Sequence, residues 1–264
     1  MVLTIPLFRS SREPSETMTA APNLQIVADY AEMSAAAAAI VAETVKRNPR
    51  IAISVPTGGT PVGMFDDLIA RVESGDLSFA ETDIFCLDEY VGATPEDGNS
   101  LTGWLKKAFL DHIDAPAGKI HMLPSTARDL TAAAAQYEAA ISAAGGLELA
   151  VIGLGPNGHI AYNEPGSTLD SRTHVLTLTP ESIAQASGYF EGRSVRTEAI
   201  TVGVATILEA RNIVVIVSGA SKADILYRTL REKPTTDVPA SFLQLAKNPV
   251  LVIADQASAA RLGS

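Results

Sequence analysis

A histidine and a glutamate lie close together in the glycine-containing stretch Gly153–Pro165, and an asparagine precedes them. These residues are Asn157, His159 and Glu164. A histidine titrates near neutral pH and can move protons, and a neighbouring carboxylate can fix its tautomer and orientation. A histidine that only hydrogen-bonds its own loop is the structural alternative. The company of Asn157 and Glu164 favours a proton-transfer site.

A second candidate is the acidic pair Asp88-Glu89, which directly follows an apolar run. A carboxylate at the end of a buried strand, in a partly apolar cleft, can have a raised pKa and act as a general base. A helix cap or a surface turn is the alternative interpretation of such a pair. The sequence therefore offers Asp88 as a base without settling its role.

Two further segments could hold an anion. One is a turn between an apolar run and a helical pattern, made of Thr57, Gly58, Gly59 and Thr60. Glycines let the backbone approach a ligand, and the free N–H groups of a helix start favour negative charge. The other is Lys222, which could contact a phosphate as a point charge. A tight turn and a solvated lysine are the structural alternatives.

The elements that must position these residues alternate along the chain. Strands are predicted at 24–27, 50–55, 83–87, 120–123, 147–152, 174–178, 212–218 and 250–254, and helices at 30–47, 62–72, 100–112, 127–144 and 222–230, with a short one opening at 179–181. This order predicts an α/β fold, a doubly wound, mostly parallel and Rossmann-like sheet flanked by helices. Ligands of such sheets bind beyond the carboxyl ends of the strands, where all four candidate segments lie.

The net charge and the apolar runs of the chain indicate which classes of partner are unsuited to it. The chain has 264 residues with 20 basic and 30 acidic side chains, a formal net charge of −10. Such a charge, without a basic cluster, argues against nucleic acid and anionic membranes as partners. No apolar run approaches the roughly 20 residues of a membrane-spanning helix, and no signal-peptide pattern is visible. We therefore expect a cytoplasmic protein. One cysteine, Cys86, and four scattered histidines favour no metal site.

Two boundaries follow from the pattern. Residues 1–22 show no periodicity, which predicts a disordered N-terminal tail. Residues 23–264 are expected to form a single α/β catalytic domain, because no linker divides them. Within it, a segment of about 166–196 is expected to act as a mobile lid.

Six segments together resemble one known family. They are PTGGTP (56–61), LDEYVG (87–92), GLGPNGHIAYNEPGS (153–167), SRT (171–173), TVGVATIL (201–208) and SGASKA (218–223). In this order and spacing, over roughly residues 24 to 254, the chain resembles the glucosamine-6-phosphate deaminases, also called isomerases. The related 6-phosphogluconolactonases share the fold but usually carry a GHTASLFP-like segment where this chain has GHIAYNEP. The resemblance therefore favours a deaminase.

The resemblance implies a cofactor-free conversion of glucosamine 6-phosphate and water into fructose 6-phosphate and ammonia. Asp88 would move a proton between C2 and C1 of the open-chain sugar, and His159, oriented by Asn157 and Glu164, would assist ring opening. The turn 57–60 and Lys222 would hold the phosphate. The expected partner is a small amino-sugar phosphate, with a homo-oligomer left open. A lactonase-like hydrolase and a non-catalytic sugar-phosphate sensor are the alternatives.

Two positions depart from the family pattern. Typical deaminases have a segment like NSRFF whose arginine clamps the phosphate, and Gly188 stands at that position here. Arg193 or Arg196 could replace this cation. Allosteric members carry basic residues where this chain has His174 and Leu176. Activation by N-acetylglucosamine 6-phosphate is therefore not expected.

Overall fold

The structure is a computed structural model that describes residues 21–189 and 196–263. Within these residues the main sheet has seven strands in the order β1-β10-β9-β6-β2-β3-β5, and all neighbouring strands are parallel. The strands are β1 Asn23–Val27, β2 Ala52–Val55, β3 Asp83–Cys86, β5 Ile120–His121, β6 Leu147–Gly153, β9 Ile213–Val217 and β10 Val250–Asp255. The predicted mostly parallel α/β sheet is thereby confirmed.

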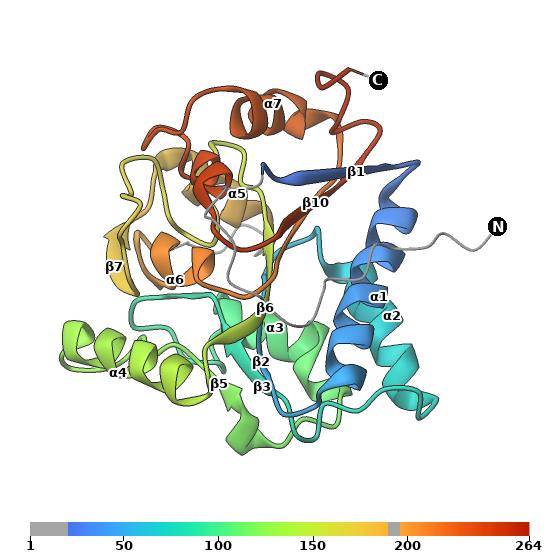
Figure 1. The fold of residues 1–264 in the computed structure, drawn as a ribbon. Coiled ribbons are helices and arrows are strands. Elements are labelled where there is room, and N and C mark those ends of the chain that lie inside the picture. Colours follow the sequence, from blue (N-terminus) through green and yellow to red (C-terminus); the bar gives the residue numbers. More distant parts are fainter. Residues whose placement is uncertain (1–20, 190–195, 264) are drawn as a thin grey trace.

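Helices cover both faces of this sheet. They are α1 Tyr30–Arg47, α2 Val62–Glu73, α3 Leu101–Ala108, α4 Leu130–Ala143, α5 Pro180–Tyr189, α6 Val204–Leu208 and α7 Ala223–Arg231, with the short helices η1 Leu110–His112, η2 Ala117–Lys119, η3 Ala220–Lys222 and η4 Pro239–Leu245. Figure 1 shows α1 and α2 on one side of the central strands and α4 and α6 on the other. Among the described residues, no helix is both long and apolar enough to cross a membrane.

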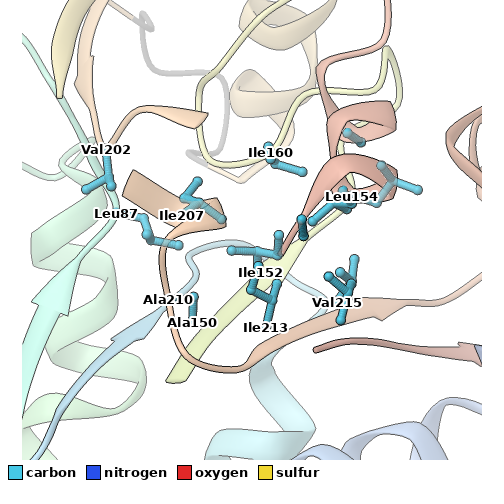
Figure 2. Packing of buried hydrophobic residues seen from close by; sticks show 14 of the residues in the cluster. Leu87, Ala150, Ile152, Leu154, Ile160, Val202, Ile207, Ala210, Ile213 and Val215 are labelled. Atoms are coloured by element: carbon cyan, nitrogen blue, oxygen red, sulfur yellow. The ribbon is translucent and has the colours of Figure 1, made fainter. Parts of the chain in front are cut away.

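Alternate side chains of the central strands point into two different cores. On β2, Ile53 packs into the core that contains Met33 of α1 and Phe65 of α2. On β6, Ile152 packs into the opposite core with Ile207 of α6, as Figure 2 shows. Because both faces are buried, the strands are continuous apolar runs rather than alternating ones.

The direction of winding reverses between β2 and β6, which are neighbours in the sheet. From β2 the chain proceeds through β3 to β5 at one edge, and from β6 it proceeds through β9 to β10 on the other side. Such a switch point opens a crevice beyond the carboxyl ends of the two central strands. The turn 57–60 follows β2 and the stretch 153–165 follows β6, so both flank this crevice.

A second sheet was not predicted. It is antiparallel, with the order β4-β8-β7, and its strands are β4 Asp88–Tyr90, β8 Glu198–Thr201 and β7 His174–Thr177. The predicted strand 83–87 ends one residue earlier, at Cys86, and the chain then pairs with β8 instead of continuing in the main sheet. The strand predicted at 174–178 is present, but in this small sheet. Through its pairing with both β4 and β7, strand β8 joins the strand that begins at Asp88 to the strand that precedes α5.

The predicted tail and lid lie partly outside the described residues. Residues 1–20 of the tail and residues 190–195 of the lid, which include Arg193, are not described. The described part of the lid segment contains β7 and α5, and Gly188 falls in the last turn of α5. The mobility of this segment stays a prediction.

Candidate active site

One cleft collects the predicted segments. It opens at the carboxyl ends of β2, β3, β6 and β9. Its lining comprises Pro56, Thr57, Gly58, Gly59, Thr60, Leu87, Asp88, Leu101, Trp104, Gly153, Leu154, Gly155, His159, Ala161, Tyr162, Ser182, Ala186 and Lys222. The lining combines apolar side chains with a few polar and ionisable groups, as is usual for a small-molecule site.

Asp88 is buried at the start of β4, where the chain leaves the main sheet. Burial raises the pKa of its carboxyl to about 7, and the nearby Glu89 adds to the rise. Thr57 opposes this effect by donating a hydrogen bond from Oγ1 to Oδ1 of Asp88 at 3.1 Å. A carboxyl with a pKa near neutrality can both accept and return a proton at the same pH. A base that moves a proton from one carbon atom to a neighbouring one needs this ability to accept and return the proton.

Glu89 has a different task from its neighbour. Its carboxylate accepts hydrogen bonds from Ser100 Oγ at 2.5 Å, from Leu101 N at 3.0 Å and from Thr102 N at 2.9 Å. Ser100 is the N-cap of α3 and accepts a hydrogen bond from Gly103 N. Glu89 therefore satisfies the free N–H groups at the start of α3. The capping interpretation holds for Glu89, whereas Asp88 faces the cleft.

His159 lies at the cleft with polar side chains around one ring nitrogen. Its Nδ1 is 3.6 Å from Glu164 Oε2 and 3.3 Å from Ser182 Oγ. Asn157 Nδ2 donates to Glu164 Oε2 at 2.7 Å, while Asn157 Oδ1 accepts from the backbone N–H of His159 at 3.2 Å. Asn157 and Glu164 thus form a support behind the imidazole. They do not line the cleft themselves.

Glu164 is ionised in this arrangement. Burial alone would raise its pKa, but hydrogen bonds from His159, Ser182 and Asn157 hold it at about 2. Thr179 adds contacts from its backbone N–H and its hydroxyl, each at 3.3 Å. A fixed negative charge beside Nδ1 favours the tautomer that carries its proton on that nitrogen.

The imidazole of His159 rests directly against Gly155. A Cβ at position 155 would lie 2.2 Å from Nε2 and Cδ2 of the ring, far inside contact distance. The loop is held in this shape by backbone bonds from Gly155 N to His159 O and from Gly158 N to Gly155 O. Gly158 has a φ of 89°, which favours glycine. The glycines of this loop thus let the ring reach its place.

The turn 57–60 and Lys222 make the same cleft suited to an anion. The turn 57–60 leads into α2, and Gly58 has a φ of 98°. Lys222 donates from Nζ to the carbonyl of Leu154 at 2.7 Å, and burial lowers its pKa to about 8. Among the described residues that line the cleft, Lys222 is the only lysine or arginine. Arg196 is engaged elsewhere, with Asp97 at 3.4 Å and the carbonyl of Val91 at 3.3 Å.

All nine predicted site residues come together. Seven line the cleft, and Asn157 and Glu164 lie behind His159. Sequence reasoning missed Ser182, Thr179, Tyr162 and Trp104 as parts of the site. The sequence Thr179-Pro180-Glu181 indicated a helix start, and this capping signal was the available clue to Thr179. The roles of the nine residues stay predictions.

The chain is similar to known proteins over most of its length. The sequence model of the family described as "Glucosamine-6-phosphate isomerases/6-phosphogluconolactonase" matches residues 27–252. The glucosamine-6-phosphate deaminase of Rhodopirellula baltica is 41% identical over 240 residues, which cover 90% of this chain and 95% of that protein.

Solved structures give the same result. A monomeric glucosamine-6-phosphate deaminase superposes with a TM-score of 0.87 at 35% identity, covering 90% of this chain and 99% of its own. A 6-phosphogluconolactonase from Trypanosoma cruzi superposes with a TM-score of 0.72 at 20% identity, covering 95% of this chain and 100% of its own. At 20% identity the second likeness concerns the fold alone.

Proposed function

Because the chain belongs to the family of glucosamine-6-phosphate isomerases and 6-phosphogluconolactonases, we propose that it is an isomerising deaminase of glucosamine 6-phosphate. The observation that carries this proposal is the set of groups that line one cleft. They are a buried carboxyl with a pKa near 7, a histidine supported by a carboxylate, and a glycine turn with a lysine.

The chemistry starts with opening of the sugar ring. His159 exchanges a proton with the ring oxygen and the C1 hydroxyl, which releases the C1 aldehyde. Glu164 and Asn157 hold His159 in one orientation. Glu164 contacts Nδ1 of the imidazole, and Asn157 accepts a hydrogen bond from the backbone N–H of His159. The phosphate lies against the N–H groups of the turn 57–60 and the ammonium of Lys222.

The proton transfer between carbon atoms follows. Asp88, in its ionised form, takes the proton from C2, and the electron pair of that bond forms the C1=C2 double bond. The C1 carbonyl oxygen takes up a proton from the ammonium group of the substrate, which gives a neutral enolamine. The same carboxyl then returns the proton to C1, which leaves an imine at C2. Water adds to this imine, and the C–N bond breaks to release ammonia and fructose 6-phosphate. Each step is a proton transfer or a hydration, so the residues of the cleft suffice.

The remaining parts of the proposal concern the whole protein. We propose that residues 23–264 form a single catalytic domain, that the segment of about 166–196 closes over the substrate, and that the enzyme acts in the cytoplasm. The relative that resembles it in structure is described as monomeric. That likeness favours activity of a single chain over a requirement for a homo-oligomer.

An ammonia-release assay over a panel of sugars tests the proposal. We expect ammonia from glucosamine 6-phosphate and little from unphosphorylated glucosamine, and none from the Asp88→Asn variant. The same preparations are tested for hydrolysis of 6-phosphogluconolactone, which the lactonase alternative requires. Lactone hydrolysis without ammonia release would overturn the proposal, and binding of sugar phosphates without turnover would support a sensor.

A further inference from the structure

A tyrosine outside the cleft forms hydrogen bonds with the backbone at the turn 57–60, to which we assign the phosphate. Tyr30 is the first residue of α1. Its hydroxyl donates to the carbonyl of Gly59 at 3.3 Å and accepts from the backbone N–H of Gly63 at 2.9 Å. The phenol thus bridges both sides of the segment 60–62, where the turn becomes helix α2. Tyr30 does not line the cleft.

The bridge supplies a contact that the turn itself lacks. The N-cap of α2 is Pro61, which makes no side-chain capping hydrogen bond. The first N–H groups of a helix need partners from outside the helix, and Tyr30 provides one for Gly63. The ring also packs closely against this position, because a Cβ at Gly63 would lie 3.2 Å from Cε1 of Tyr30. The start of α2 is therefore fixed from α1.

The carbonyl contact fixes the orientation of one peptide plane. In a planar trans peptide the C=O of one residue and the N–H of the next point in opposite directions, and no described peptide bond is cis. While Tyr30 holds the Gly59 carbonyl on the α1 side, the N–H of Thr60 must point the other way. Thr60, whose N–H points away from the Tyr30 hydroxyl, is one of the residues that line the cleft.

We propose that Tyr30 is a positioning residue that orients the turn 57–60 for phosphate binding. The inference rests on the proposed function only in assigning the phosphate to this turn. Without the hydroxyl, the Gly59 carbonyl keeps only the long hydrogen bond from Val62 N at 3.5 Å, and the first turn of α2 loses a hydrogen-bond partner. The consequence is weaker binding of phosphate, with the proton-transfer groups left in place.

The test is the substitution Tyr30→Phe, which keeps the ring and removes both hydrogen bonds. Calorimetric titration with inorganic phosphate, and separately with fructose 6-phosphate, measures binding without turnover. We expect both dissociation constants to rise about 5- to 10-fold, as for the loss of one or two hydrogen bonds. In the ammonia assay KM should rise by a similar factor, while kcat stays within about twofold.

Tyr227→Phe is the matched control, because Tyr227 lies on α7 and its ring faces Arg261. The thermal unfolding curve of each variant is measured first, and the titrations are made at a temperature at which every variant is folded. Unchanged dissociation constants for Tyr30→Phe would overturn the proposal, as would a fall in kcat at unchanged phosphate affinity. Absence of ammonia release by the wild-type chain would contradict the proposed function alone, since the phosphate titrations do not depend on turnover.

Discussion

Thr57 Oγ1 lies 3.1 Å from Asp88 Oδ1 and donates a hydrogen bond to it. Thr57 follows β2 and Asp88 follows β3, and these two strands are neighbours in the parallel sheet. The bond therefore joins the first residue of the proposed phosphate turn to the proposed base. It also opposes burial, which otherwise raises the pKa of Asp88.

Removal of this hydroxyl should shift the pH dependence of turnover. In Thr57→Val the ionised form of Asp88 loses a hydrogen bond, so its pKa rises from about 7. A hydrogen bond to a charged group contributes about 1.5–3 kcal/mol, which corresponds to one pH unit or more. We expect the acidic limb of the kcat profile to move upward by about one pH unit. Thr57→Ser keeps the hydroxyl and should leave the limb in place.

The substitution Asp88→Asn should abolish turnover and stabilise the folded protein at alkaline pH. The folded pKa of about 7 lies above the usual 3.8, so between these values the folded state holds a proton that the unfolded state releases. Wild-type stability therefore falls as pH rises from about 4 to about 7. The asparagine carries no such cost, and the variant should be more stable at pH 8 by roughly 2–4 kcal/mol.

Urea unfolding at pH 4.5 and pH 8 measures this difference. The gap in the free energy of unfolding between Asp88→Asn and wild type should be fully present at pH 8 and fall to roughly a quarter of that value at pH 4.5. An equal gap at both pH values would show that the substitution acts through packing. Ammonia release at a near-normal rate by the variant would remove Asp88 from its role as the base.

The substitution Gly155→Ala should cost activity through the histidine. The added methyl group would meet Nε2, Cδ2 and Cε1 of His159 at 2.2 to 2.4 Å, so the ring must move. A displacement of about 1 Å at a reacting group can cost on the order of 100-fold in rate, and we expect a loss of that size in kcat. Phosphate affinity should change less than kcat, because the clash at position 155 involves the His159 ring and not the turn 57–60.

Gly118→Ala is the matched control, since an added Cβ there meets nothing within 4 Å. The signals of the imidazole in NMR spectra of both variants report on the ring directly. A normal kcat for Gly155→Ala would contradict this prediction. It would mean that the loop 153–158 shifts to accept the methyl group while the His159 ring keeps its position.

The sequence was informative where a feature is local. The strand 50–55 and the following glycine turn combine an apolar run with residues that permit a close backbone approach, and both are visible in one short segment. The small sheet is different: β4 and β8 each have only three or four residues, and they pair across more than 100 positions of the chain. Short strands with such distant partners give no periodic signal of their own.

The same distinction applies to the site. Asp88, His159 and Lys222 each follow a recognisable strand, so the rule for parallel sheets brings them to one edge. Ser182 and Thr179 reach His159 and Glu164 only because α5 lies over the cleft. No pattern within the chain determines where that helix packs. Polar residues at an ordinary helix start therefore gave no sign of their contact with the site.

The absence of an arginine at Gly188 gives the last prediction. Lys222 is the only lysine or arginine among the described residues of the cleft lining, and α5, which contains Gly188, contributes Ser182 and Ala186 to that lining. A bidentate guanidinium–phosphate contact contributes roughly 2–3 kcal/mol. If the chain lacks only this clamp, Gly188→Arg should lower KM for glucosamine 6-phosphate about 10-fold or more, with kcat little changed. Gly118→Arg, remote from the cleft, controls for added positive charge. An unchanged KM would show that the site holds the phosphate in another way or prefers another amino-sugar phosphate.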